Sequence, residues 1–210
     1  TTYVPDDNFE QALIDLDYDD ELDDYVLTAN ISGVTSLDVN GKEISDLTGI
    51  EDFTALTDLQ CNDNQLTTLD VSSNTALTTL NCSNNQLTSL DVSANTDLGN
   101  LHAHDNSLTS LDLTNNAELH SLYIAVNNLT SLDVSNNTAL QNFSCYNNQL
   151  TSLDVSNNIA LTYFQPHGNL LTSIDLSSNT ALTRMNISNN QLTYLNMKNG
   201  LTDQIDDFNA

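Results

Sequence analysis

Residues 56–66 read LTDLQCNDNQL and residues 129–137 read LTSLDVSNN, and lightly varied copies of both strings return every 21 residues. The first leucine of each copy falls in a column that consists of Leu56, Leu77, Leu98, Leu119, Leu140, Leu161 and Leu182. A period this short is typical of a solenoid, in which one repeat forms one coil that cannot bury its apolar edge alone. Neighbouring coils therefore stack and share one continuous core.

Apolar and polar residues alternate within each repeat, as they do in a β-strand. Leu59 and Cys61 are expected to point inward, with residues 60 and 62 outward. Residues 69–71 repeat the alternation on the opposite side of the coil. Since 21 residues leave no room for a helix of useful length, we predict a leucine-rich repeat solenoid of short parallel strands and extended turns.

An unbroken asparagine column follows the first strand of every coil. Where the chain bends out of a strand, its inward backbone groups lose their ladder partners, and a buried asparagine amide can donate to and accept from them. We therefore assign a structural role to Asn64, Asn85, Asn106, Asn127, Asn148, Asn169 and Asn190.

The three cysteines share one inward column with small and medium apolar residues. Cys145 lies three coils from Cys82, roughly 14 Å at about 4.8 Å per coil, which is too far for a disulfide. Cys61 and Cys82 lie on adjacent coils, where a bridge would pull two in-register strands together. We expect three buried, reduced thiols.

The chain is strongly acidic. Its 29 aspartates and glutamates face three basic residues, for a formal net charge of −26. This balance argues against nucleic acid and against anionic membrane surfaces as partners. It favours solubility in saline or calcium-rich surroundings outside the cell.

The N-terminal segment differs from the repeats. Residues 6–16 predict an amphipathic helix with Asp6 or Asp7 as N-cap and with Phe9, Leu13 and Leu16 on one face. We therefore divide the chain into a helical cap over residues 1–33 and a solenoid over residues 34–210. The solenoid has about eight coils, and the last is expected to be truncated at Ala210 because the repeat register returns at Ile205, Phe208 and Ala210.

The repeat L-x-x-L-x-C-x-x-N-x-L-T-x-L-D-V-S-x-N-T resembles the 21-residue cysteine-containing repeats of internalin J-like bacterial surface proteins. The segment VPDDNFEQALIDL, residues 4–16, resembles the cap of secreted leucine-rich repeat proteins of the Bacteroidetes. The resemblance implies a secreted or surface-anchored adhesion protein, commonly the recognition part of a longer polypeptide, and it implies no particular ligand.

The large outward side chains concentrate on the first strand of the coils, a surface that we call the sheet face. Leucine-rich repeats normally curve this face around a partner, and tyrosine and arginine are common interface anchors. The alternative is that strand surfaces simply favour tyrosine. Our candidate ligand-binding residues are His102, His104, Tyr123, Tyr146, Tyr163, His167 and Arg184.

Two sets of residues are weak candidates for metal ligands. His102 and His104 point the same way from one strand, but zinc requires three or four protein ligands, so exposed histidines of a binding patch are favoured. Asp15, Asp17 and Asp19 alternate as in a calcium loop, but the segment departs from an EF-hand at Asp20 and Val26. A solvated acidic cap is favoured over calcium, which stays an alternative.

The second strand of the coils carries an aspartate column flanked by serine and threonine, a surface that we call the aspartate face. Its members are Asp70, Asp91, Asp112, Asp133, Asp154 and Asp175. Carboxylates about 4.8 Å apart repel one another unless hydroxyls, backbone amides or hard cations stabilise each of them. Hydrogen bonding within the coil is favoured over calcium binding.

The sequence contains no G-x-S-x-G, H-E-x-x-H or phosphate-binding loop. We therefore predict a non-catalytic extracellular recognition or adhesion module that binds a protein partner through the sheet face. A glycan-binding module and a structural spacer of a larger surface protein are the alternatives.

Overall fold

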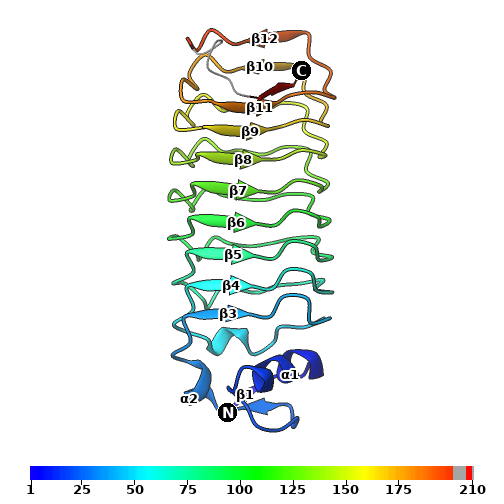
Figure 1. Cartoon of the computed structure of the whole chain (residues 1–210), viewed down its shortest axis with the longest axis vertical. Helices are drawn as coiled ribbons and strands as arrows, with labels where there is room; N and C mark the ends of the chain where they lie inside the picture. The colour runs from blue at the N-terminus through cyan, green and yellow to red at the C-terminus, as the bar shows by residue number, and fades with distance from the viewer. Residues whose placement is uncertain (201–206, 210) are drawn as a thin grey trace.

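The computed structural model describes residues 1–200 and the backbone of residues 207–209. The chain forms a long stack of coils with a helical segment at its N-terminal end (Figure 1). One strand of each coil contributes to a nine-stranded parallel sheet in the order β13-β11-β9-β8-β7-β6-β5-β4-β3. These strands are β3 (Ser36–Asp38), β4 (Asp58–Gln60), β5 (Thr79–Asn81), β6 (Asn100–His102), β7 (Ser121–Tyr123), β8 (Asn142–Ser144), β9 (Tyr163–Gln165), β11 (Arg184–Asn186) and β13 (Asp207–Asn209).

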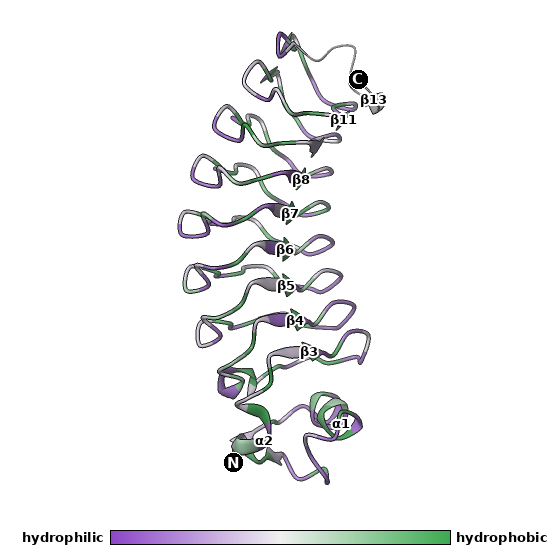
Figure 2. Cartoon of the chain, turned by 60° about the vertical axis from the view of Figure 1, so that its left-hand side comes forward, coloured by the Kyte–Doolittle hydropathy of each residue, from purple (hydrophilic) through white to green (hydrophobic). Residues whose placement is uncertain are grey.

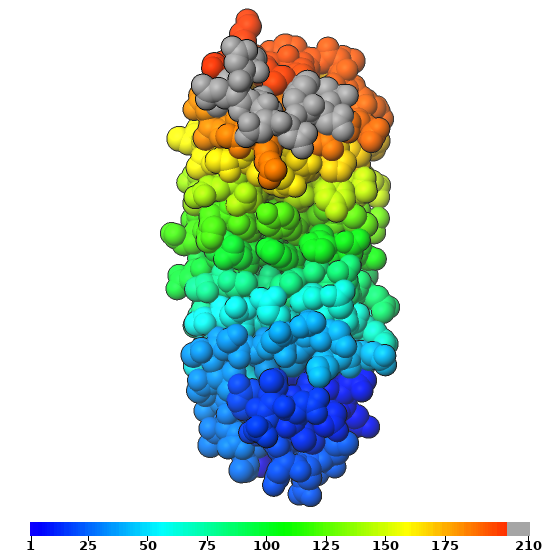
Figure 3. Space-filling model, in the orientation of Figure 1, coloured from blue at the N-terminus to red at the C-terminus, as the bar shows by residue number. Residues whose placement is uncertain are grey.

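The sheet register follows the 21-residue period directly. Leu59 pairs with Leu80, and Leu80 pairs with Leu101, so equivalent residues of successive coils lie side by side. The coils succeed one another in chain order along the whole stack (Figure 3). The predicted parallel-strand leucine-rich repeat solenoid is confirmed.

The opposite side of the coils contains little regular strand. It has β10 (Ser173–Asp175) paired in parallel with β12 (Tyr194–Asn196), and an isolated bridge between Asp70 and Asp91. A short 3-10 helix, η1 (Ile50–Asp52), occupies this side of the first, 22-residue coil. Elsewhere extended turns connect the coils, which bow gently along the stack (Figure 2).

The core runs through the middle of the stack and contains the predicted leucine columns. Cys61, Cys82 and Cys145 are buried and carry free thiols. Burial raises the pKa of all three thiols, that of Cys82 to about 12. The predicted structural, inward position of the cysteines is therefore confirmed.

The first asparagine column completes the backbone hydrogen bonding between coils. The Asn127 carboxamide oxygen accepts the Leu108 N–H at 2.9 Å, and its amide donates to the carbonyls of Ala103, Ile124 and Ala125 at 3.0 to 3.2 Å. One side chain thus joins two coils through four hydrogen bonds, as the sequence analysis predicted.

A second asparagine column lies on the other side of the core. Asn137 is fully buried, and its amide donates to the carbonyls of Leu113 at 3.1 Å and Asn116 at 2.8 Å in the preceding coil. The same pattern holds at Asn74, Asn95, Asn116, Asn158 and Asn179. In the described part of the chain, asparagine side chains therefore hydrogen-bond neighbouring coils to each other on both sides of the core.

A residue with left-handed backbone precedes the first asparagine column in each coil. Aspartate, asparagine and glycine occupy most of these positions, and they tolerate positive φ well. Val126, with φ of 53°, is the exception, because a β-branched side chain is strained in this conformation.

The N-terminal segment packs on the first coil. It contains β1 (Thr2–Tyr3), α1 (Asp7–Asp15), β2 (Tyr25–Val26) and α2 (Thr28–Ile31), with β1 and β2 antiparallel. Asp6 is the N-cap of α1, as predicted, and also accepts hydrogen bonds from Ser45 in the first coil. Leu16 was expected on the buried face but is 40% exposed, because α1 ends at Asp15.

At the other end of the stack, β13 pairs with β11 so that Phe208 lies beside Met185. This pairing agrees with the register expected for the last coil. Ile205 and Ala210, the other two residues of that expectation, lie outside the described residues.

Candidate functional site

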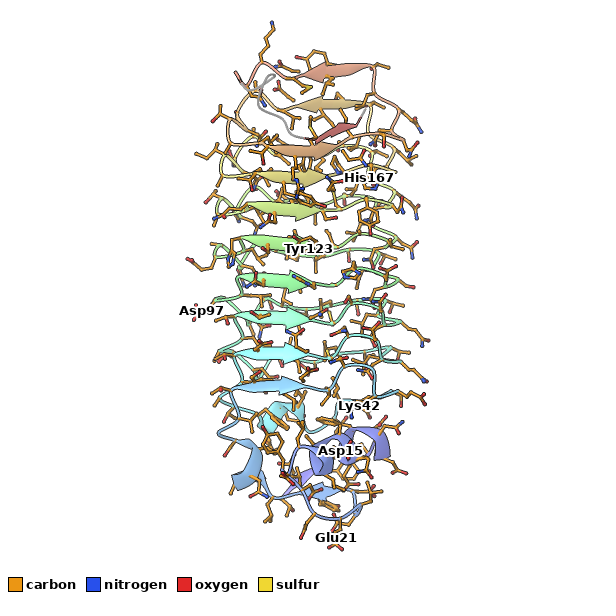
Figure 4. All side chains as sticks on the ribbon, viewed as in Figure 1. Asp15, Glu21, Lys42, Asp97, Tyr123 and His167 are labelled. Carbon is orange, nitrogen blue, oxygen red and sulfur yellow. The ribbon has the colours of Figure 1, made fainter. Side chains whose placement is uncertain are left out.

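The sheet face consists of the outward residues of β4 to β9 and β11. Because the strands are in register, side chains 21 residues apart are neighbours along the stack. The seven candidate residues occupy five consecutive coils of this face, from β6 to β11. Figure 4 shows Tyr123 over the middle of the strands, His167 toward their right-hand ends, and Asp97 projecting at the left-hand edge.

His102 and Tyr123 form the first of two aromatic pairs. They are register partners in β6 and β7, and their rings meet edge to face with centroids 4.7 Å apart and an interplanar angle of 62°. Burial, and then the neighbouring His104, lowers the pKa of His102. His102 is therefore a largely neutral ring at pH 7 that extends the aromatic surface of Tyr123.

Tyr146 and His167 form the second pair, on the coils of β8 and β9. Their rings stack with centroids 4.6 Å apart and an interplanar angle of 12°. Partial burial lowers the pKa of His167, and its buried Nδ1 has no hydrogen-bond partner among the described residues. The pair is therefore a face-to-face stack just beyond the ends of β8 and β9.

The other three candidates surround these pairs. Arg184 is exposed and is the register partner of Tyr163, at the start of β11 and β9. His104 Nδ1 lies 2.8 Å from Asp105 Oδ2. The structure thus places all seven residues on one face, but in two aromatic pairs and three flanking positions rather than as one cluster.

Small outward residues fill the space between the large ones. Ala125 and Ser144 are each 2% exposed although they belong to outward columns, because the neighbouring large side chains cover them. The histidines were expected to be solvent-exposed, and they are half-buried instead.

The first coils of the sheet face carry a polar network that the sequence analysis missed. The Gln60 amide donates to Asp58 at 2.7 Å, the Asn81 amide donates to Gln60 at 3.0 Å, and the Ser83 hydroxyl donates to Asn81 at 2.7 Å. These side chains satisfy one another, so this half of the face has fewer free polar groups than its composition indicates.

The candidate metal ligands do not converge. Among the described residues no group of three or more histidine, cysteine, aspartate or glutamate side chains is placed to hold a metal ion. Asp15 instead contacts Lys42 Nζ at 3.2 Å and accepts a hydrogen bond from Gln11. Asp17 has a left-handed backbone, and burial raises the pKa of Asp19.

The carboxylates of the aspartate face accept hydrogen bonds from residues of their own coil. Asp112 Oδ1 accepts the Thr114 hydroxyl at 2.6 Å and the Thr114 N–H at 2.9 Å, and these bonds lower the pKa of Asp112. Asp70, Asp91, Asp133 and Asp175 likewise accept the N–H two residues on and have lowered pKa values. The hydrogen bonds expected within each coil are therefore present.

A second break in the repeat lies at the edge of the sheet face, where the chain enters β6 and β7. Asp97, Gly99, Glu118 and His120 line one open hollow there. None of these four residues is among the candidate residues named from the sequence. These four residues stand out when the residues that precede each strand are aligned by the 21-residue period, as the strand residues were.

Two of three comparisons with known proteins agree with this architecture. The chain matches no protein-family model. It is 39% identical over 72 residues to Internalin J of Listeria monocytogenes, a match that covers 34% of this chain and 8% of that protein. The structure of internalin C2 of Listeria monocytogenes aligns with a TM-score of 0.84 and 23% identity over 98% of this chain and 92% of that one.

A leucine-rich repeat protein of Leptospira interrogans aligns with a TM-score of 0.79 and 22% identity, over 87% of this chain and 50% of that one. The chain thus spans a small part of Internalin J and half of the Leptospira chain. No helix among the described residues is long and apolar enough to cross a membrane.

The repeat, the parallel strand ladder and the asparagine columns together define a leucine-rich repeat solenoid. Within this class the chain is similar to Internalin J over the shared 72-residue stretch, and it has the fold of internalin C2.

Proposed function

We propose that this chain is a non-catalytic recognition module that binds a protein partner through the sheet face. The observation that carries the proposal is the gathering of large, repeat-breaking side chains on five consecutive coils of one face. The aspartate face is monotonous by comparison. Because the repeat itself maintains the scaffold, residues that break it are the ones free to determine specificity.

The composition of the face fits a protein interface. Tyrosine, arginine and histidine combine contact area with hydrogen bonding, and rings that are already packed against a neighbour lose little conformational freedom on binding. The two ring pairs are held in this way before any partner arrives.

The partner and the setting follow from the same features. A net charge of −26 disfavours nucleic acid and anionic lipid, so the partner offers a neutral or basic surface. The resemblance to internalins supports a secreted or cell-surface location. The proposed binding involves no metal ion and no cofactor.

The test compares two double variants in solution. Tyr123→Ala combined with Tyr146→Ala should weaken partner binding by more than about 2 kcal/mol, roughly 30-fold in Kd. Asp112→Ala combined with Asp133→Ala is the matched control on the opposite face and should bind like the wild type. Partners are first captured by crosslinking from intact cell surfaces, and affinity is then measured with the purified partner.

A glycan ligand is the second candidate, and one observation favours it. The stacked rings of Tyr146 and His167 each turn one face away from the other, and a sugar ring can stack on such an aromatic face. A glycan array probed with the wild type and the tyrosine variant separates the two. The protein partner could instead bind the tyrosine variant and fail to bind the aspartate variant. That result would place the binding site on the aspartate face and contradict the proposal.

A further inference from the structure

The chain departs from its own repeat just before β6 and β7. At the position three residues before the strand the other coils carry alanine, in Ala55, Ala76, Ala139, Ala160 and Ala181. These two coils carry Asp97 and Glu118 instead. Two residues further on, where threonine prevails, they carry Gly99 and His120. Four departures on two adjacent coils meet at one place on the surface.

The departures create an open hollow of about 550 Å³, which Thr78 and Asn100 also line. Gly99 is required for its shape. A Cβ atom at residue 99 would lie 2.6 Å from Cε1 of His120, so the imidazole occupies the space that a side chain on the preceding coil would fill. The backbone of Gly99 is fixed by its hydrogen bond to the Thr78 carbonyl at 2.9 Å. The His120 ring therefore forms one wall of the hollow.

The hollow has carboxylates and no cation of its own. The chain has three basic residues. Lys42 pairs with Asp15 beside the N-terminal helix, Arg184 lies three coils beyond Glu118, and Lys198 lies further along still. At about 4.8 Å per coil, Arg184 is roughly 14 Å away along the stack. No lysine or arginine of this chain lines the hollow, so a guanidinium or ammonium group there has to come from another molecule.

We propose that this hollow receives an arginine side chain of the protein partner, which rests on the function proposed above. A guanidinium is planar, pairs with carboxylates through two parallel hydrogen bonds and stacks on aromatic rings. Asp97 and Glu118 supply the carboxylates, and His120 supplies the ring. A lysine ammonium would gain the charge attraction but neither the paired geometry nor the stacking.

The location ties the hollow to the sheet face. Asn100 lines it and begins β6, and two residues along the same strand His102 contacts Tyr123. A partner segment that crosses the strands over the first aromatic pair would reach the hollow at the edge of the sheet. The hollow then adds charge recognition to an aromatic surface.

The proposal is tested with a small probe that needs no knowledge of the partner. Nα-acetyl-arginine amide is titrated into the ¹⁵N-labelled chain at about 0.15 M salt, where charges more than about 8 Å apart are largely screened. We expect a saturable shift of the Gly99 amide and of the His120 ring. Nα-acetyl-lysine amide should bind at least about threefold more weakly, and Nα-acetyl-leucine amide should leave both signals in place.

Two variants with the same change of charge provide the specificity control. Asp97→Ala combined with Glu118→Ala restores the residue that the other coils carry, so the fold is retained, and the arginine probe should lose at least tenfold in affinity. Asp112→Ala combined with Asp133→Ala removes two carboxylates from the aspartate face and should keep the wild-type response. If both double variants lost the same affinity for the arginine probe, the loss would reflect the change in net charge alone. That result would overturn the proposal.

The remaining outcomes are equally decisive. Absence of saturation at Gly99, or equal affinity for the lysine probe, contradicts the guanidinium site. Saturation of Gly99 by Ca²⁺ or Zn²⁺ at stoichiometric concentration would make it a metal site instead. The Tyr123→Ala, Tyr146→Ala variant should keep the Gly99 response, so failure of the sheet-face function and failure of the arginine site are separable.

Discussion

The imidazole of His167 lies nearly parallel to the ring of Tyr146, with 12° between the planes and 4.6 Å between the centroids. The two residues are 21 positions apart in the sequence, and the coil period alone brings them together. A double-mutant cycle of Tyr146→Ala and His167→Ala should therefore give a coupling free energy of about 0.5 to 1.5 kcal/mol, measured by urea unfolding.

The matched control for this cycle is Tyr146→Ala with His102→Ala. These residues stand on coils two steps apart, roughly 10 Å along the stack, so their effects should add within about 0.5 kcal/mol. Coupling as large in the control as in the stacked pair would contradict the structure.

Acidification should destabilise the chain through two histidines. Partial burial holds the pKa of His102 and of His167 below 6.5 in the folded state. The unfolded chain therefore binds more protons than the native chain below about pH 6.5, and stability falls as the pH drops through that window. The aspartates with lowered pKa values act only at more acidic pH, near and below 3.8.

The measurement is the melting temperature between pH 7.5 and 5. His102→Gln combined with His167→Gln should flatten the profile in this range. A wild-type melting temperature that rises on acidification would contradict the sign of both shifts.

Asn127→Ala should cost about 1 to 3 kcal/mol of unfolding free energy. The change removes four hydrogen bonds and leaves the Leu108 N–H, whose acceptor is the Asn127 carboxamide oxygen, unpaired inside the stack. Asn128 is exposed and makes only a long contact with Gln149, at 3.4 Å. Asn128→Ala should therefore change stability by less than about 0.5 kcal/mol, and equal losses at both positions would argue against the ladder.

Val126→Asn should stabilise the chain by about 1 kcal/mol, because asparagine tolerates the left-handed backbone that strains valine. The equivalent position in another coil offers the reverse experiment. Asn84 is exposed with φ of 51°, and Asn84→Val should destabilise by a similar amount. Chemical unfolding of both variants checks the pair, and two changes of the same sign would refute the backbone explanation.

The three thiols should react with a disulfide reagent at pH 8 only after denaturation. Cys61, Cys82 and Cys145 are fully buried, and burial raises their pKa values, so the native chain holds almost no accessible thiolate. Three equivalents should appear in denaturant and fewer than one within minutes without it. Rapid native-state labelling of any one cysteine would show that its coil opens locally.

The sequence by itself determined the solenoid, the inward cysteine column and the structural role of Asn127, because a 21-residue period allows only one stacking register. It also placed all seven candidate residues on one face. Only the tertiary structure decided which of them touch, since pairs such as His102 with Tyr123 depend on the ring orientations of neighbouring coils. The hollow at Gly99 likewise exists only because the His120 ring turns over the preceding coil, and no property of either residue alone specifies that contact.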